Sequence, residues 1–255
     1  LEPDNIAQWT PEKFALAVAA VTRRLTAAGF APRLILPSTT SAKQASVWFD
    51  AVAATPGAME LVRELSFHMY RDASNAALKD IAARGQKHGI ETAMLEYWLG
   101  KGTHQILHRC LRVANISSWQ SRAYLGYSDV DLTKPPGQRL FEPEDVRVNL
   151  LYFHSIRRGA VRIGASSSEW RDFDPVAFVN PGEAWSVIVE AHKPGAVAIE
   201  GLPPGDYWIT TATARGTDLP DAPVRLEAGA TLAADIGASG VIAVSRLKPG
   251  PRGGG

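Results

Sequence analysis

Four polar side chains stand at or beside the ends of short apolar segments, where enzymes often place reactive groups. Glu2 opens the chain in LEPDN, His68 and Tyr70 end LSFHMY, and Glu96 lies at the end of ETAMLEYW. In a βα barrel, side chains at the carboxyl ends of the strands face the active site. Two carboxylates on different strands could protonate a leaving oxygen and attack an anomeric carbon, which is the chemistry of glycosidic bond cleavage. A single strand-end Glu is nearly as often part of a structural ion pair, so the pairing carries the hypothesis.

The elements that must position these residues alternate along the first part of the chain. Short β-branched or apolar runs are separated by helical patterns, which is typical of βα units around a parallel sheet. Strands are predicted at 33–37, 65–70 and 91–97, and within 117–127. Helices are predicted at about 10–29, 41–55, 75–84, 103–114 and 143–158. The expected fold class is α/β, with a TIM-type barrel.

After Gly159 the pattern changes to short strands separated by turns. Turn signals occur at Asn180-Pro181-Gly182, Lys193-Pro194-Gly195 and Pro203-Pro204-Gly205-Asp206, so this part is predicted to be an antiparallel β-sandwich. Its predicted strands are 176–179, 185–192, 197–200, 207–214, 224–226 and 241–247. We therefore expect residues 1–159 to belong to the barrel, 160–248 to the sandwich, and 249–255 to a flexible tail.

Composition and charge exclude several classes of protein. The hydrophobic fraction is 45% and the charged fraction 21%, which is ordinary for a globular protein. A net charge of +1 does not provide the basic surface that nucleic-acid binding needs. No apolar stretch approaches the ~20 residues of a membrane span. The single cysteine, Cys110, lies in an apolar helical run and is interpreted as a core residue.

Other motifs give little support to rival chemistries. His104 and His108 form HQILH on a predicted helix, with the spacing of a two-His zinc site, but Gln105 stands where a metalloprotease needs its Glu base. A Gly-rich phosphate loop, a Gly-x-Ser-x-Gly elbow and a CxxC pair are all absent from the sequence. We expect no metal and no organic cofactor. A lyase or aldolase would need a Lys or metal cluster at the strand ends, and the sequence suggests neither.

The order of segments resembles a known family. LEPDN, RLILPSTT, LSFHMY, TAMLEYW and LYFHSIRRGAVRIGASS, followed by VAFVNPGEAW and GLPPGDYW, resemble the later part of a clan A retaining glycoside hydrolase, and of family 30 or a relative in particular. The resemblance implies that Glu2 ends the fourth barrel strand as general acid/base and that Glu96 ends the seventh as nucleophile. Retaining chemistry would place the two carboxyl groups ~5 to 5.5 Å apart.

The resemblance also assigns roles to neighbouring residues. Tyr70 would hydrogen-bond the nucleophile and orient it, and His68 is a candidate for lining the sugar subsite, with a core position as its alternative. Trp98 and Trp119 could stack on sugar rings or pack in the core. Leu1 stands where the clan has an Asn that contacts the sugar. A carbohydrate-binding protein or pseudoenzyme that keeps the barrel without catalysis therefore remains the alternative.

Further expectations follow from the resemblance. The chain would supply about strands four to eight, so activity would need the N-terminal half of the barrel, on the same chain or as a second fragment. An open half-barrel leaves strand edges and apolar surface exposed, so the chain alone is expected to be poorly soluble or to associate, and to be inactive. The protein is expected to act on a carbohydrate and to be secreted or extracytoplasmic.

Overall fold

The computed structural model describes residues 2–97, 103–120, 133 and 144–249. These residues form two compact units, which are described separately: 1–102 with 109–123, and 103–108 with 124–255. The first is called the parallel unit and the second the antiparallel unit. The sequence-based boundary at residue 159 differs from this division. The difference arises because α5 (Glu144–Ser155) packs on strands of the antiparallel unit.

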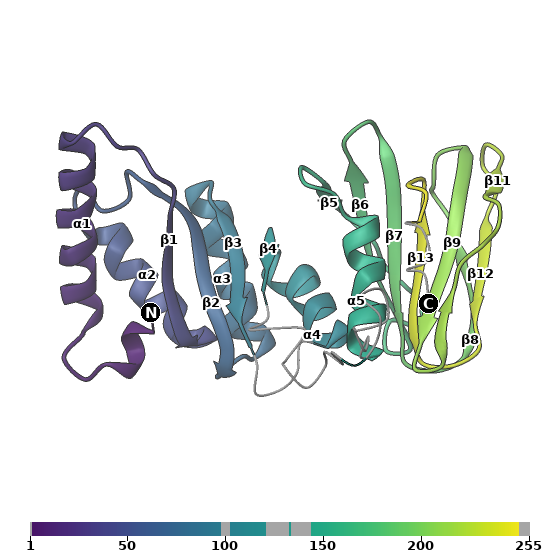
Figure 1. Ribbon diagram of the computed structural model, residues 1–255, viewed down its shortest axis with the longest axis horizontal. Helices are drawn as coiled ribbons and strands as arrows, with labels where there is room; N and C mark the ends of the chain where they lie inside the picture. Colours follow the sequence, from purple (N-terminus) through teal and green to yellow (C-terminus); the bar gives the residue numbers. More distant parts are fainter. Residues whose placement is uncertain (1, 98–102, 121–132, 134–143, 250–255) are drawn as a thin grey trace. The chain divides into compact units, whose positions relative to one another are not determined.

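The parallel unit is a four-stranded sheet in the order β1-β2-β3-β4, and every neighbouring pair of strands is parallel. Its strands are β1 (Leu34–Ser41), β2 (Val62–Arg71), β3 (Glu91–Glu96) and β4 (Ser118–Trp119). Its helical segments are η1 (Pro3–Asn5), α1 (Pro11–Ala27), α2 (Ala42–Ala54), α3 (Asn75–His88) and η2 (Cys110–Ala114), while α4 (His104–Arg109) spans the division between the units. Helices connect successive strands, as parallel pairing requires (Figure 1).

Local sequence signals explain where these helices begin. The side chains of Thr10, Ser41 and Ser74 each accept a hydrogen bond from a backbone N–H of the first helical turn, and so cap α1, α2 and α3. Gly89 ends α3 in the left-handed conformation, with φ of 63°. These caps fix the strand–helix joints, and therefore fix where each strand ends.

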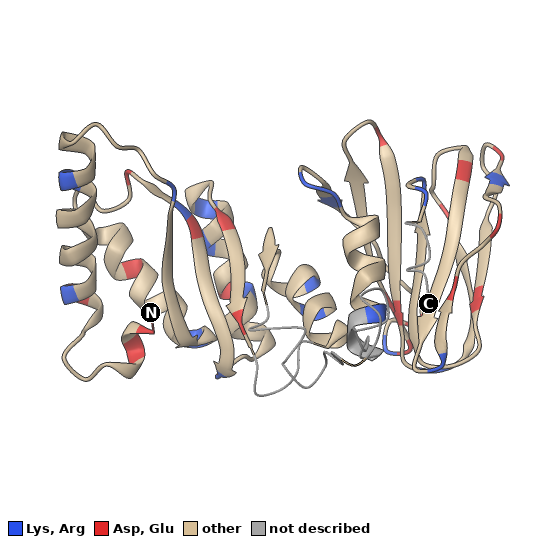
Figure 2. Cartoon of the chain, viewed as in Figure 1, with Lys and Arg blue, Asp and Glu red and all other residues tan. Residues whose placement is uncertain are grey.

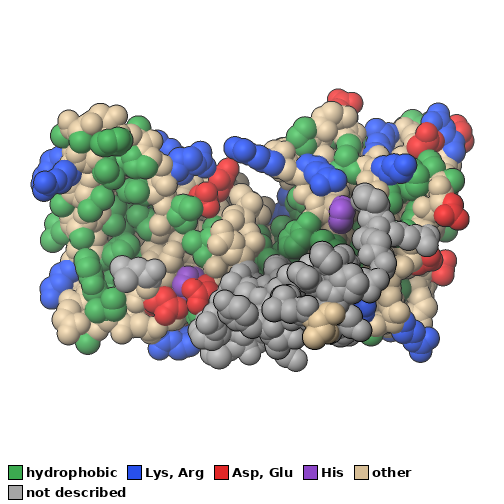
Figure 3. Space-filling view, viewed as in Figure 1, with side chains coloured by type: hydrophobic (Ala, Val, Ile, Leu, Met, Phe, Trp, Pro, Cys, Tyr) green, Lys and Arg blue, Asp and Glu red, His purple; other side chains and the backbone are tan. Residues whose placement is uncertain are grey.

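The core of the parallel unit lies between the sheet and its helices. In β2, Leu65 to Met69 are all buried, which is typical of a strand covered on both faces. Phe49 and Val52 of α2 and Leu78 of α3 are also buried. The outward face of α1 differs, since Leu16 is 64% exposed and apolar side chains gather over this helix in Figure 3.

The antiparallel unit contains a seven-stranded sheet in the order β10-β9-β13-β7-β6-β5, with β11 also paired to β9, and a two-stranded sheet of β8 and β12. The bounds are β5 (Val161–Ile163), β6 (Phe173–Asn180), β7 (Ala184–Ala191), β8 (Gly195–Ile199), β9 (Gly205–Thr213), β10 (Gly216–Asp218), β11 (Val224–Leu226), β12 (Leu232–Ile236) and β13 (Gly240–Ser245). Both sheets contribute to one apolar cluster that includes Phe173, Tyr207, Ile236 and Ile242.

The surface of both units carries mixed charge. Acidic and basic side chains are interspersed over the elements of each unit (Figure 2). Among the helices that the structure describes, none combines the length and the apolar character needed to cross a membrane.

One close backbone approach in the antiparallel sheet gives a stability prediction. A Cβ atom on Gly240, at the start of β13, would lie 2.1 Å from the carbonyl oxygen of Ala212 on β9. We expect Gly240→Ala to lower the free energy of unfolding by about 2 kcal/mol or more, because the central pairing of β13 with β9 must separate. Gly237→Ala is the matched control, since a Cβ there meets no atom within 4 Å. Equal denaturation midpoints for the two variants would contradict the assignment.

Candidate active site

The sheet brings His68, Tyr70 and Glu96 together at one edge. They lie at or near the carboxyl ends of β2 and β3, which are adjacent and parallel, so their ends meet on the same side. The register pairs His68 with Glu96, and it shifts between Phe67 and His68. Such an irregularity re-aims the following side chains and is common next to active sites. Here it sets His68 beside the end of β3.

Glu2 reaches the same edge through the short helix η1. Asp4, within η1, accepts hydrogen bonds from the backbone N–H of Thr40 (2.9 Å), from the Thr40 hydroxyl, and from the backbone N–H of Ser41 (3.2 Å). Thr40 and Ser41 end β1. The side chain of Asp4 is only 6% exposed. Its carboxylate therefore fastens the segment that carries Glu2 to the carboxyl end of β1.

Arg71 extends this anchor to the catalytic candidates. Its Nη2 donates to the Thr40 hydroxyl at 2.7 Å and to Asn5 Oδ1 at 3.0 Å. The amide of Asn5 in turn donates to Glu2 Oε2 at 2.8 Å. Three elements, η1, β1 and β2, are thus joined by polar contacts, and Glu2 is held at their junction.

Glu2 also contacts the histidine of β2. Its Oε1 lies 2.8 Å from His68 Nδ1. The His68 side chain is 5% exposed, while that of Glu2 is 28% exposed. Both oxygens of Glu2 therefore have a partner, yet the carboxyl group keeps access to solvent. A proton donor to a bound ligand needs this combination of a fixed position and an open side.

Glu96 is hydrogen-bonded to Tyr70. The Tyr70 hydroxyl donates to Glu96 Oε1 at 2.8 Å. The Tyr70 ring meets the His68 ring edge-on, with centroids 6.0 Å apart, and also contacts Tyr97. These contacts fix the phenol, so its hydrogen bond holds one Glu96 oxygen in place.

The result is a compact three-residue cluster. One oxygen of Glu2, one oxygen of Glu96 and one ring nitrogen of His68 all lie within 4.8 Å of one another. Chemically, this arrangement can place an acid and a nucleophile on either side of a scissile bond. The same three atoms could also ligate a metal ion, although each carboxylate already accepts a hydrogen bond from a neutral donor, Asn5 or Tyr70.

The remaining predicted residues are not among the three residues of this cluster. Trp119 lies in β4, is half-buried, and is the register partner of Met94 on β3. Trp98 and Leu1 lie outside the described residues. The predicted roles of the two tryptophans on sugar rings remain predictions.

Sequence reasoning missed the anchor of the site. Asp4, Asn5 and Arg71 were not among the predicted site residues. Asp4 bonds the end of β1, Asn5 donates to Glu2, and Arg71 donates to Asn5. The available signal was the position of Asp4 and Asn5, two polar residues directly after Glu2-Pro3. Their partners are distant in the chain, so only a fold could identify them.

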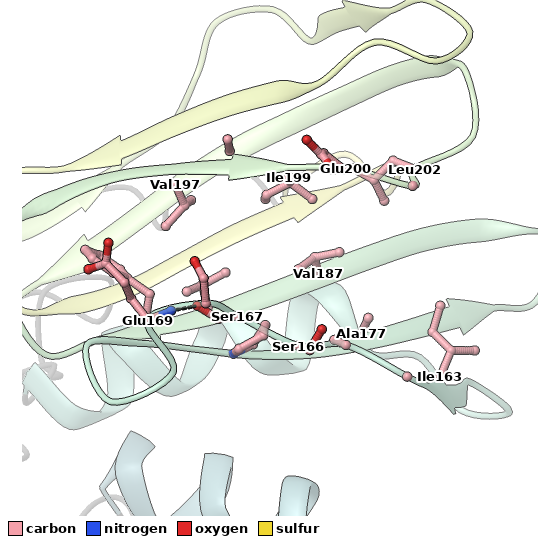
Figure 4. A pocket seen from close by; sticks show the side chains of 18 of the residues that line it. Ile163, Ser166, Ser167, Glu169, Ala177, Val187, Val197, Ile199, Glu200 and Leu202 are labelled. Atoms are coloured by element: carbon pink, nitrogen blue, oxygen red, sulfur yellow. Dashed lines mark hydrogen bonds between the residues drawn. The ribbon is translucent and has the colours of Figure 1, made fainter.

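The antiparallel unit contains a separate cleft of about 850 Å³. Figure 4 shows apolar side chains such as Val187 and Val197 lining it, with Ser167 and Glu169 at one end. The cleft contributes no residue to the cluster of Glu2, His68 and Glu96. The cleft is therefore a feature separate from that three-residue cluster.

Comparison with known proteins gives a structural answer only. No protein family matches the sequence, and neither does any curated protein. Solved structures do share the fold. A glycoside hydrolase family 30 subfamily 8 xylanase from Clostridium acetobutylicum is similar with a TM-score of 0.72 and 13% identity, over 93% of this chain and 60% of that one. The catalytic domain of a family 30 xylanase from Talaromyces cellulolyticus has a TM-score of 0.69 and 14% identity, over 96% and 60% of the two chains.

A conserved exported protein from Bacteroides fragilis is also similar, with a TM-score of 0.62 and 14% identity, over 92% of this chain and 60% of that chain. The chain has a glycoside hydrolase-like fold. It spans about 60% of the length of these solved chains. At these identities the likeness establishes the fold alone.

The anchor at Asp4 gives a testable prediction for the site. Asp4→Ala removes three hydrogen bonds to a buried carboxylate, and we expect it to lower the free energy of unfolding by about 2–3 kcal/mol. It should also release η1 and so move Glu2 away from His68. The measurements are chemical denaturation and the ¹⁵N shifts of the His68 ring. Asp80→Ala is the control, because Asp80 is exposed on α3. An unchanged His68 spectrum in Asp4→Ala would contradict the role of the anchor.

Proposed function

We propose that this chain carries the catalytic residues of a retaining β-glycoside hydrolase, with Glu2 as general acid/base and Glu96 as nucleophile. The observation that supports the proposal most directly is the proximity of the two carboxylates, which each place an oxygen within 4.8 Å of the other and of His68. Retaining enzymes separate the two carboxyl groups by about 5–5.5 Å, and inverting enzymes by about 6.5–9.5 Å. The family 30 xylanases of similar fold add support.

The first step of the proposed reaction uses both residues. A Glu96 oxygen attacks the anomeric carbon while the bond to the leaving oxygen breaks, and Glu2 gives its proton to that oxygen. A covalent glycosyl ester on Glu96 results. The Tyr70 hydroxyl holds Glu96 Oε1, which leaves Oε2 as the attacking atom. His68 and Asn5 fix the carboxyl group of Glu2, so that its proton is directed rather than free to rotate.

The second step reverses the role of Glu2. Its carboxylate takes a proton from water, and the water oxygen attacks the anomeric carbon and displaces Glu96. Two inversions give net retention. His68 Nδ1 lies against Glu2 Oε1 in a nearly buried position and can stabilise either form of the carboxyl group, as donor to the anion or as acceptor from the acid. This chemistry requires no metal and no organic cofactor.

The alternative is a protein that binds carbohydrate without cleaving it. A panel of aryl β-glycosides separates the two functions, because a binding protein would change its fluorescence or melting temperature with the sugar and release no aglycone. We also propose an extracytoplasmic location, which the exported neighbour supports only by analogy.

Substitution of the two carboxylates tests the assignment. Glu96→Ala should abolish turnover of activated aryl β-glycosides, because the covalent ester cannot form. Azide should partly restore it and give the inverted glycosyl azide, detectable by NMR. Glu2→Ala should retain the first step on substrates with good leaving groups, which need little proton donation, and lose activity on natural glycosides. Glu91→Gln is a matched control, since Glu91 is an exposed residue at the opposite end of β3. Full activity on a natural substrate in either site variant would remove that residue from its role.

The outer edge of β1 supports a second, structural requirement. Among the described strands, β1 pairs with β2 alone, and its Ile35 is 45% exposed. We propose that catalysis needs additional βα units that pair with this edge, supplied on the same polypeptide or as a separate fragment. An unpaired edge otherwise recruits other chains.

This requirement predicts that the 255-residue chain alone self-associates and is inactive, and that co-expression with the preceding βα units yields a monomer with glycosidase activity. Light scattering and aryl-glycoside turnover measure the two properties. A monodisperse and active protein from the 255 residues alone would contradict the requirement while leaving the catalytic assignment intact. An inactive monomeric assembly would instead contradict the catalytic assignment.

A further inference from the structure

A second group of ionisable side chains is buried in the antiparallel unit. Asp174 on β6 and Glu190 on β7 are directly opposite each other in the antiparallel ladder, so their side chains leave the same face of the sheet. Asp174 is 8% exposed and Glu190 is 5% exposed. Two carboxylates therefore share one buried position on this face of the sheet.

His108 of α4 completes the group. Its side chain is almost fully buried, and one of its ring nitrogens, one Asp174 oxygen and one Glu190 oxygen all lie within 4.8 Å of one another. His108 Nε2 makes no hydrogen bond and lies 3.7 Å from Asp174 Oδ2. That distance exceeds the 2.7–3.2 Å range of an N–H···O hydrogen bond. It is close to the roughly 3.4 Å that separates two ligands bound at about 2.0–2.1 Å to a tetrahedral zinc ion.

Tyr152 of α5 determines how the His108 ring is presented. His108 Nδ1 lies 2.9 Å from the Tyr152 hydroxyl, and the two rings meet edge-to-face. A histidine that binds a metal through one nitrogen commonly donates its other N–H to a neighbouring acceptor, which fixes the tautomer. In this arrangement the Tyr152 hydroxyl oxygen can accept from Nδ1–H. The lone pair of Nε2 is then directed at the carboxylates.

We propose that His108, Asp174 and Glu190 form a structural binding site for a divalent transition-metal ion, with zinc as the best match. One imidazole nitrogen with two carboxylate oxygens suits zinc, whereas calcium and magnesium prefer ligand sets made of oxygen alone. The ion would tie α4 to β6 and β7. His104 is not one of the three ligands, so the site differs from the two-histidine pattern of HQILH.

The inference departs from the expectation of no metal that the sequence suggested. That expectation considered a catalytic HxxxH pair on one helix. The structure instead joins one histidine to a cross-strand pair that lies more than sixty residues further along the chain. The site is independent of the proposed glycosidase chemistry, because it shares no residue with Glu2, His68 and Glu96.

Metal binding by the full chain tests the proposal directly. The protein is stripped with a chelator and titrated with Co²⁺, whose visible absorption reports nitrogen and oxygen ligands in a tetrahedral site, and then with Zn²⁺. We expect binding of one equivalent per chain, displacement of Co²⁺ by Zn²⁺, and a rise in melting temperature with Zn²⁺. Asp174→Asn and Glu190→Gln keep the shape of the side chains and should weaken Zn²⁺ binding more than tenfold, as should His108→Ala.

Two further variants make the test specific. Tyr152→Phe should keep the stoichiometry and weaken binding about tenfold, since it removes only the partner of Nδ1. Glu96→Gln should leave Zn²⁺ binding unchanged, because Glu96 belongs to the other three-residue cluster. The proposal is overturned if the wild-type chain binds no Co²⁺ or Zn²⁺, or if Asp174→Asn and Glu190→Gln bind Zn²⁺ as tightly as the wild type. It is also overturned if Glu96→Gln abolishes Zn²⁺ binding, or if the melting temperature of the wild-type chain changes with pH but not with added Zn²⁺.

Discussion

The carboxylate of Asp4 is the contact on which the candidate site depends. Parallel strands bring His68, Tyr70 and Glu96 to one edge of the sheet through the ladder itself, because β2 and β3 are neighbours. Glu2 belongs to no described strand and would not be placed by that ladder. Its position follows from the bonds between Asp4 and the end of β1, which fix η1 and thereby set Glu2 against His68.

The two carboxylates have different surroundings, and this difference matches their different proposed roles. Glu96 accepts a hydrogen bond from the Tyr70 hydroxyl. Glu2 meets an imidazole nitrogen, which can donate or accept according to its tautomer. A nucleophile must remain ionised, while an acid/base residue must change protonation state twice in each cycle. Tyr70 and His68 therefore give two chemically identical side chains, Glu96 and Glu2, different surroundings that suit different roles.

Part of this site was predictable from the sequence for a physical reason. Apolar runs such as LSFHMY end in polar residues, and a buried parallel strand exposes polar groups only at its end. His68, Tyr70 and Glu96 were identified in that way. Asp4 and Arg71 were not, because each gains its importance from partners on other elements. No local pattern encodes a bond between residues 4 and 40.

The same limit applied to the fold. Strand β12 was missed because its sequence, LAADI, has two alanines and an aspartate that weaken the β signal, although its alternating burial is clear in the structure. The three-residue strands β5 and β10 are too short to show any period. Helix α5 was placed with the barrel since it follows the βα rhythm, but its packing partners are β13 and β9. Periodicity identifies an element, whereas only packing assigns it to a neighbour.

Because Asp4 binds backbone donors, the sequence around its partners can change while the geometry of the site is kept. Two of its three bonds come from main-chain N–H groups at positions 40 and 41, and every residue except proline supplies that donor. These two hydrogen bonds therefore tolerate almost any side chain at positions 40 and 41, and no sequence motif is needed to form them. Evolutionary drift could erase the motif around Thr40 and Ser41 while the geometry persisted. A fold can in this way outlast the sequence signature by which its relatives would be recognised.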